Sequence, residues 1–206
     1  MESDSKEEKM NTARTTNTRK LVLLALFTAI VVVLQALAAV LPIYPFTLTL
    51  VLVPMVIGAA LVSAVAGGWL GLVFGLVVLL TGNANLFLAV NPLGTILVVL
   101  VKGTLAGLAA GAVYKLLATK NKVVATITAA AVCPIVNTGI FILGCYAFFL
   151  PTLTEWASGS DYENVTAFIF IGMIGLNFVL EFAINIVLSP VIVRLIQYGQ
   201  DKRAIN

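Results

Sequence analysis

Lys102 and Glu181 are ionisable residues that lie inside long apolar stretches of the sequence. Placing one such charge at the centre of a lipid bilayer costs about 2.5 to 3.5 kcal/mol on insertion scales, so the protein must offset that cost. An ion pair between the two side chains would do so by locking two helices together, and so would a polar ligand that both side chains contact. Lys102 and Glu181 therefore indicate either a structural link or a binding site.

Asparagine side chains accompany this pair of charges. Asn177 and Asn185 lie four residues before and after Glu181, which places all three along one stripe of a helix. Four further asparagines can converge on the same half of the molecule: Asn83, Asn85, Asn91 and Asn137. Amides both donate and accept hydrogen bonds, which suits a neutral or zwitterionic small molecule with several polar groups. Hydrogen bonding between helices, without a ligand, is the other role that fits these residues.

The sequence argues against catalysis. It contains no histidine, which removes histidine-based metal sites, catalytic triads and proton relays. The segment Lys102-Gly103-Thr104 is no phosphate-binding loop, because the order of Gly, Lys and Thr is wrong and the upstream glycine pattern is missing. We therefore expect a protein that is not an enzyme, does not hydrolyse ATP by itself, and uses no metal or cofactor.

The composition is that of a membrane protein. Hydrophobic residues make up 61% and charged residues 10% of the 206 positions, with a mean hydropathy of +1.09, whereas a soluble domain carries about 25% charged residues. Because a spanning helix needs roughly 20 apolar residues, we predict an all-α bundle of six transmembrane helices. The expected spans are 21–41, 48–65, 67–80, 92–117, 123–150 and 165–196. Together they form a domain over residues 21–198, between a flexible tail over 1–20 and a short tail over 199–206.

Lysine and arginine residues predict the orientation of this bundle. They cluster in segments 14–20, 115–122 and 194–203, which six spans place on one side of the membrane. The three opposite connections, 42–47, 82–91 and 151–164, contain no lysine or arginine. Because cytoplasmic loops carry the excess of basic residues, we expect both termini in the cytoplasm. The expected location is the plasma membrane of a bacterium. The three opposite connections, with Asn83, Asn85 and Asn91, would then lie outside.

Small residues recur every four positions in three of the expected helices. These positions are Ala25 and Ala29 in the first helix, Gly67, Gly71 and Gly75 in the third, and Gly103, Gly107 and Gly111 in the fourth. Such faces let helix backbones approach each other closely inside a membrane. Packing within the bundle is the ordinary role of both glycine faces and of the alanine pair. A sliding surface is the other role that the glycines could have.

From Lys20 to about Ile196, the chain resembles the substrate-binding (S) component of energy-coupling factor (ECF) vitamin transporters. The features that match are a length of 206 residues, the opening Leu24-Ala25-Leu26-Phe27-Thr28-Ala29, and a glycine-rich stretch from Pro54 to Gly75. The segment Asn91-Pro92-Leu93-Gly94 and the asparagine-bearing last helix also resemble this group. Each motif is loose, so the resemblance rests on their order along the chain.

The resemblance implies a division of labour between this chain and its partners. The alanine pair of the first helix, here Ala25 and Ala29, docks on a transmembrane coupling subunit, and two ATPase subunits drive uptake. The binding site lies in the outer half, formed mainly by the last three helices and capped by outer loops. This implies substrate contacts by Lys102, Asn137, Asn177 and Glu181, with 83–91 as gate material. Lys102 favours a carboxylate-bearing vitamin such as pantothenate or folate.

An ion-coupled secondary transporter of a small polar solute is the alternative function. The intramembrane charges of Lys102 and Glu181 are typical of such proteins. Secondary transporters often carry inverted repeats, and the sequence has no convincing match between its two halves. A membrane enzyme fits less well still, since it would depend almost entirely on Glu181.

Overall fold

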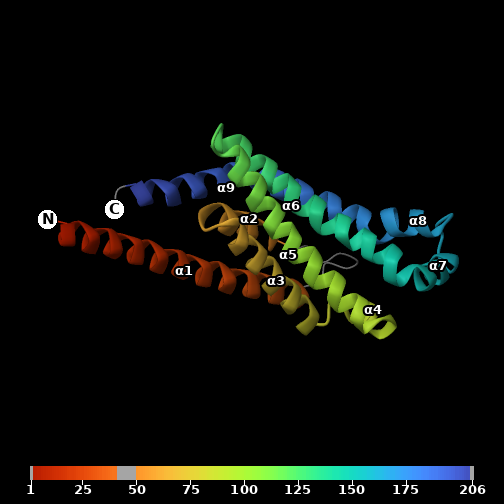
Figure 1. Cartoon of the computed structure of the whole chain (residues 1–206). Helices are drawn as coiled ribbons and strands as arrows, with labels where there is room; N and C mark the ends of the chain where they lie inside the picture. The colour runs from red at the N-terminus through yellow and green to blue at the C-terminus, as the bar shows by residue number, and fades with distance from the viewer. Residues whose placement is uncertain (1, 41–49, 205–206) are drawn as a thin grey trace.

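The computed structural model describes the backbone of residues 2–40 and 50–204, and the side chains of residues 17–40 and 50–198. Every regular element in these ranges is a helix, which confirms the predicted all-α class (Figure 1). The elements are α1 (Glu2–Val40), α2 (Leu52–Leu61), α3 (Ala64–Leu80), α4 (Asn85–Val90), α5 (Pro92–Leu117), α6 (Lys122–Gly144), η1 (Cys145–Phe149), α7 (Leu150–Ser158), α8 (Val165–Ala167), η2 (Phe168–Gly175) and α9 (Leu176–Ala204). The two η elements are π-helices.

Four apolar helical segments in the described ranges are long enough to cross a membrane: Asn17–Val40, Pro92–Leu117, Lys122–Ser158 and Val165–Tyr198. The second and third predicted spans correspond to shorter apolar helices, α2 with 10 residues and α3 with 17. A helix of 10 residues is only about 15 Å long, against roughly 30 Å for the hydrocarbon core. The chain turns at Ser63, whose hydroxyl accepts a hydrogen bond from the backbone N–H of Ala66 and caps α3.

The structure differs from the sequence prediction at both ends of the chain. The helix α1 begins at Glu2, within the expected flexible tail 1–20, and α9 continues to Ala204, within the expected tail 199–206. Once a helix has formed, each added residue gains a hydrogen bond without a new nucleation step. A stable apolar helix can therefore continue into a polar flanking segment.

The predicted loop 151–164 is also partly helical, which corrects the sequence prediction. Helix α6 passes through the π-helix η1 into α7, and irregular backbone is confined to the residues between Ser158 and Val165. Pro151 lies in the first turn of α7, where the missing N–H of proline is tolerated. Proline has no N–H to donate to the carbonyl of the residue four positions earlier, which lies inside η1. The π-turn accommodates this missing hydrogen bond.

The two glycine faces pack against each other between α3 and α5; the sequence predicted packing for each face but not which face each would meet. A methyl group built on Gly71 would collide with the carbonyl of Gly103, and one built on Gly107 would collide with the carbonyl of Gly67. The third pair of positions is less close, because a methyl group on Gly75 would lie 2.9 Å from the carbonyl oxygen of Val99. Only glycine permits this approach of two backbones.

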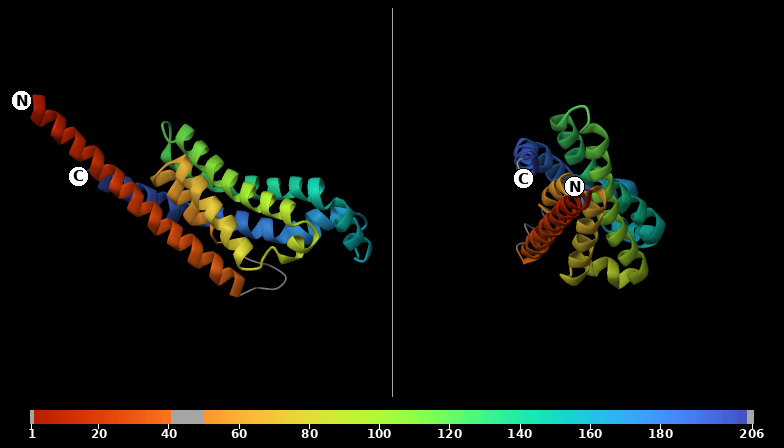
Figure 2. Two further views of the ribbon diagram at one scale, coloured as in Figure 1. Left: turned by 60° about the horizontal axis from the view of Figure 1, so that its bottom comes forward. Right: turned by 60° about the vertical axis from the view of Figure 1, so that its left-hand side comes forward.

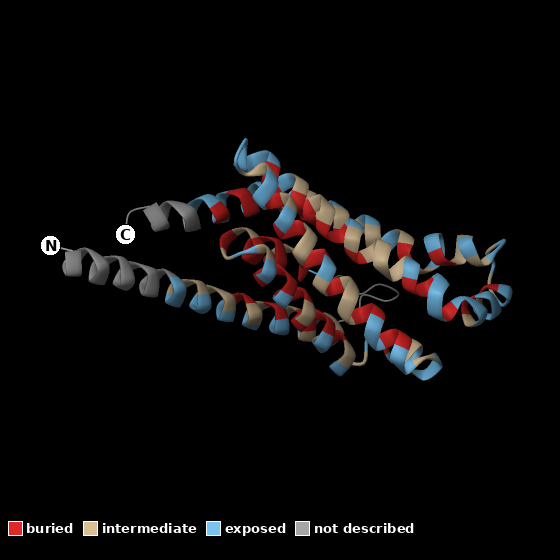
Figure 3. Ribbon diagram, viewed as in Figure 1, coloured by how far each residue is buried: buried red, intermediate tan, exposed pale blue. Residues whose placement is uncertain are grey.

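Burial differs strongly among the helices (Figure 3). Eight of the ten residues of α2 are buried, so this short helix forms the centre of the bundle. Helix α1 packs against α2 and α3, and its described buried side chains form a single stripe: Phe27, Val31 and Gln35. Most of the remaining apolar surface of α1 faces outward, as expected of a helix in contact with lipid.

The two ends of the bundle differ in charge and in the elements they carry. The start of α1, the end of α9 and the α5–α6 turn lie at one end, whereas α4 and α7 lie at the other (Figures 1 and 2). Lys120 and Lys122 lie at the α5–α6 turn, while Glu155 and Glu163 lie in α7 and the segment that follows it. A cavity described below lies towards the end that carries α4.

Candidate functional site

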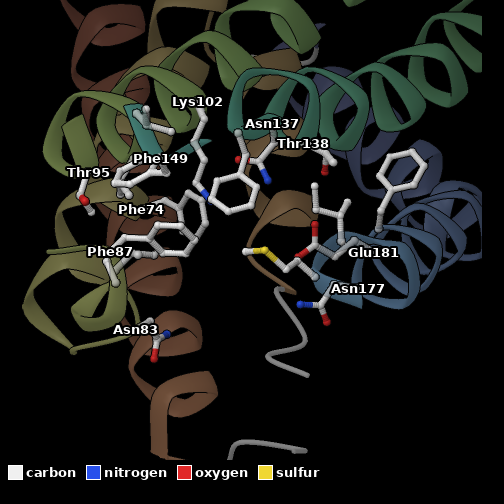
Figure 4. A pocket seen from close by; sticks show the side chains of 18 of the residues that line it. Phe74, Asn83, Phe87, Thr95, Lys102, Asn137, Thr138, Phe149, Asn177 and Glu181 are labelled. Atoms are coloured by element: carbon white, nitrogen blue, oxygen red, sulfur yellow. The ribbon is translucent and has the colours of Figure 1, made fainter. Parts of the chain in front are cut away.

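A cavity of about 250 Å³ lies between α1, α3, the start of α4, α5, α6 and the η2–α9 helix. Its wall combines a lysine, a glutamate, several amides and five phenylalanine rings, many of which are drawn in Figure 4. Because Asn83 and Phe87 line it, the cavity lies towards the end of the bundle that carries α4 (Figure 1). This mixture of apolar walls with a few convergent polar groups is typical of small-molecule sites.

Helix α5 supplies the wall that carries the lysine. Asn91 caps the helix, since its Oδ1 accepts a hydrogen bond of 2.9 Å from the N–H of Gly94, and Pro92 follows at the first helical turn. The side chain of Thr95 donates a 2.8 Å hydrogen bond to the carbonyl of Asn91. Thr95 and Lys102 are seven residues apart and both line the cavity, which places them on one face of α5.

The amino group of Lys102 lies among aromatic rings. Its Nζ is 5.1 Å from the centroid of the Phe141 ring and 6.0 Å from that of Phe74. A cation over an aromatic face gains about 0.5 to 2 kcal/mol, more when it is removed from water. The rings thus stabilise the positive charge, although they do not satisfy its N–H donors as an anionic oxygen would.

The opposite wall carries a negative charge and two amides. Asn177 and Glu181 come from the first turns of α9, and Asn137 comes from α6; all three side chains line the cavity. Figure 4 shows these groups and the amino group of Lys102 turned towards the same space. Glu181 is 8% exposed and interacts electrostatically with Lys102. The cavity therefore presents opposite charges from two different helices.

Three amide oxygens in the cavity wall are buried and have no hydrogen-bond partner among the described residues: Gln35 Oε1, Asn137 Oδ1 and Asn177 Oδ1. An unsatisfied buried polar atom costs about 1 to 3 kcal/mol, and nearly all such atoms in native proteins have partners. An occupant of the cavity that offers several N–H or O–H groups would satisfy these oxygens.

Phe87 of α4 joins the cavity to an aromatic cluster at the end of the bundle. Its ring centroid lies 4.9 Å from that of Phe149 and 5.7 Å from that of Phe141, both in edge-to-face geometry. It also lies 6.1 Å from the ring of Trp156 in α7. These contacts hold the short helix α4 against α6, η1 and α7 at the side of the cavity.

Both π-helices border the cavity, and neither was predicted from the sequence. Phe149 of η1 and Met173 and Ile174 of η2 line it. A π-turn inserts an extra residue into a helix and so changes the direction of the side chains that follow; such turns are frequent at functional sites. Here η2 sets the rotation with which Asn177 and Glu181 enter the cavity.

The cavity gathers five of the eight predicted contact residues: Asn83, Lys102, Asn137, Asn177 and Glu181. The other three lie elsewhere. Asn85 is exposed on α4, and Asn91 caps α5. Asn185 is fully buried outside the cavity lining, where its amide donates a 2.9 Å hydrogen bond to the backbone carbonyl of Glu181.

Sequence reasoning missed several residues that line the cavity. The polar ones are Gln35 in α1, Thr95 in α5 and Thr138 in α6, and the aromatic ones include Phe74 of α3 and Phe87 of α4. Gln35 carried a usable signal, because it is an amide inside the first apolar segment and such residues rarely face lipid. The phenylalanines carried none, since aromatic residues are common throughout membrane helices.

Ala25 and Ala29 are both exposed on α1. The ordinary role of such a pair, packing within the bundle, is therefore not the one found in the structure. The described residues also contain no group of three or more Cys, Asp or Glu side chains that could hold a metal ion.

Comparison with known proteins identifies one family. The model of the family described as "ECF transporter, substrate-specific component" matches residues 19–193, which is most of the chain. No curated protein and no solved structure matched the sequence.

Proposed function

The chain belongs to the substrate-specific components of ECF transporters, which are non-catalytic membrane subunits, and on this premise we propose that it captures a vitamin or related micronutrient outside the cell. It would deliver this solute together with a transmembrane coupling subunit and two ATPase subunits. The observation that carries the proposal is the cavity in which Lys102, Glu181 and three unsatisfied amide oxygens converge.

We further propose that the bundle crosses the membrane six times, with both termini in the cytoplasm. The start of α1 and the end of α9 lie at the end of the bundle that carries the α5–α6 turn with its lysines (Figures 1 and 2), which agrees with the preference of basic residues for the cytoplasmic side. The cavity, bordered by Asn83 and Phe87 at the α4 end, would then open from the outer half. Helices α2 and α3 would contribute to the two remaining crossings, of which α2 by itself covers only about half of the hydrocarbon core.

The chemistry of the wall supports a particular kind of solute. Lys102 suits an anionic group, since a lysine held by ring faces still needs acceptors for its N–H donors. Glu181 and the amide oxygens of Gln35, Asn137 and Asn177 suit N–H or O–H donors at the other side of the same molecule. Carboxylate-bearing vitamins such as pantothenate and folate offer both kinds of group.

Ala25 and Ala29 are the proposed contact with the coupling subunit. Both are exposed, and the larger apolar side chains around them, Leu21, Val22 and Leu26, are more than half exposed. Small residues on an apolar face permit close approach of a partner helix in the membrane. This face lies on the opposite side of α1 from the buried stripe of Phe27 and Val31.

The proposal is tested by mass spectrometry of the small molecule that co-purifies with the detergent-solubilised protein. That compound should bind the purified chain without nucleotide, and Glu181→Ala should weaken binding at least about tenfold, which is about 1.4 kcal/mol. Glu155→Ala, which removes an exposed carboxylate on α7, is the matched control and should bind normally. If affinity is unchanged in Glu181→Ala, Glu181 does not belong to the site.

Transport assays separate this function from ion-coupled transport, which the intramembrane charges of Lys102 and Glu181 would also suit. In sealed vesicles that contain this chain alone, we expect no uptake driven by a proton or sodium gradient. Uptake under those conditions would favour the secondary transporter.

A further inference from the structure

Gln35 is an unusual residue for its position in α1. It follows Phe27 and Val31 at intervals of four residues, so it is the third member of the one buried stripe described on this helix. Its side chain is 2% exposed, and its Oε1 has no hydrogen-bond partner among the described residues. An apolar side chain would serve packing at this position without that energetic cost.

The surroundings of Gln35 offer a reason for the amide. Gln35 lines the same cavity as Lys102, Asn137 and Glu181. These three residues stand on α5, α6 and α9, whereas α1 packs on α2 and α3. A molecule that fills the cavity and contacts Gln35 would therefore connect α1 to helices on the other side of the site.

We infer that Gln35 is a binding residue of this site, and that a bound solute fastens α1 to α5, α6 and α9 by donating a hydrogen bond to Gln35 Oε1. This inference rests on the proposed function, because it requires a solute in the cavity. The donor is an N–H or O–H group, since the unsatisfied atom is an acceptor. The helix that bears Ala25 and Ala29 thus senses whether the cavity is occupied.

The affinity test compares Gln35→Met with Leu37→Met. Methionine has a similar unbranched shape to glutamine but cannot pair with a donor in the same way, and Leu37 is 50% exposed on the outer side of α1. The probe is the compound that co-purifies with the wild-type chain. It is titrated into protein from which the bound compound has first been removed by dialysis. We expect Gln35→Met to bind it at least about tenfold more weakly, and Leu37→Met to bind as the wild type does.

Thermal unfolding of the solute-free proteins distinguishes binding from a structural role. Because Gln35→Met removes an unsatisfied buried oxygen, the empty variant should unfold at the same temperature as the wild type or a higher one. A lower unfolding temperature, or equal affinity for the probe, would overturn the inference. If the wild-type chain itself retains and binds no compound, the proposed function fails first, and the inference with it.

A distance measurement between α1 and α9 tests directly whether the solute fastens α1. Spin labels on cysteines introduced at Val33 of α1 and Val179 of α9 would report the separation of the two helices, since both positions are exposed. The native Cys133 and Cys145 are buried and should not react. We expect the probe to narrow the distance distribution in the wild-type background and not in Gln35→Met. A distribution that the probe leaves unchanged in both would refute the fastening.

Discussion

Gly71 and Gly139 provide a direct test of the packing between α3 and α5. A methyl group at Gly71 would collide with the backbone carbonyl of Gly103, whereas a methyl group at Gly139 of α6 meets nothing within 4 Å. A carbonyl cannot rotate away as a side chain can, so Gly71→Ala must move two helices apart by on the order of 1 Å to restore van der Waals contact. Overpacking of this kind costs about 1 to 3 kcal/mol.

These energies translate into opposite shifts of the unfolding temperature. For a chain of this size, 1 kcal/mol corresponds to about 2 to 4 °C, so Gly71→Ala should lower the midpoint by roughly 2 to 12 °C. Gly139→Ala should leave it unchanged or raise it by a few degrees, since alanine is favoured over glycine in helix interiors by about 1 kcal/mol. The assay is the intrinsic tryptophan fluorescence of the detergent-solubilised protein during heating. Equal effects of the two substitutions would refute the argument from backbone contact.

Three further predictions concern the site and the docking face. Lys102→Gln should weaken binding of the co-purifying compound about 10- to 100-fold, as expected for a lost charge-assisted hydrogen bond of about 1.5 to 3 kcal/mol. The variant should also no longer prefer a carboxylate compound over the corresponding carboxamide. Lys120→Gln, the control, should show neither effect in the same titration. Phe87→Ala should speed dissociation of the compound in a washout experiment, because the ring anchors α4 at the side of the cavity; an unchanged rate would show that α4 does not retain the solute. Ala25→Trp should spare binding but block co-purification with the coupling subunit, and intact co-purification would rule out the docking role.

Local sequence signals predicted the features that a short run of residues specifies, such as a helix cap or a face of regularly spaced glycines. The predicted span 92–117 agrees with α5, because Asn91 and Pro92 form an N-terminal cap that needs no tertiary information. The packing role of the glycine faces was equally readable, since glycines repeated every four residues have few uses in a membrane other than close packing, but the sequence did not specify that α3 packs on α5.

The site was less predictable because it depends on how each helix is rotated against its neighbours. The sequence places Asn177, Glu181 and Asn185 on one stripe, yet the cavity ends before Asn185, whose amide bonds instead to the carbonyl of Glu181. A stripe specifies an angle around the helix axis but not the length over which that face borders a cavity. The π-helix η2, which determines this angle for α9, has no recognised sequence signature.

Lys102 and Glu181 illustrate how the structure refines a choice that the sequence leaves open. A lysine and a glutamate in apolar helices can form a lock or line a site, and both arrangements offset the cost of burial. In the structure they face one cavity, the lysine is held by the rings of Phe74 and Phe141, and unsatisfied oxygens lie in the same wall. A pure lock would gain nothing from leaving several acceptors unsatisfied beside it, because each lowers stability. The combination is understandable if the acceptors are matched to a solute that occupies the cavity only part of the time.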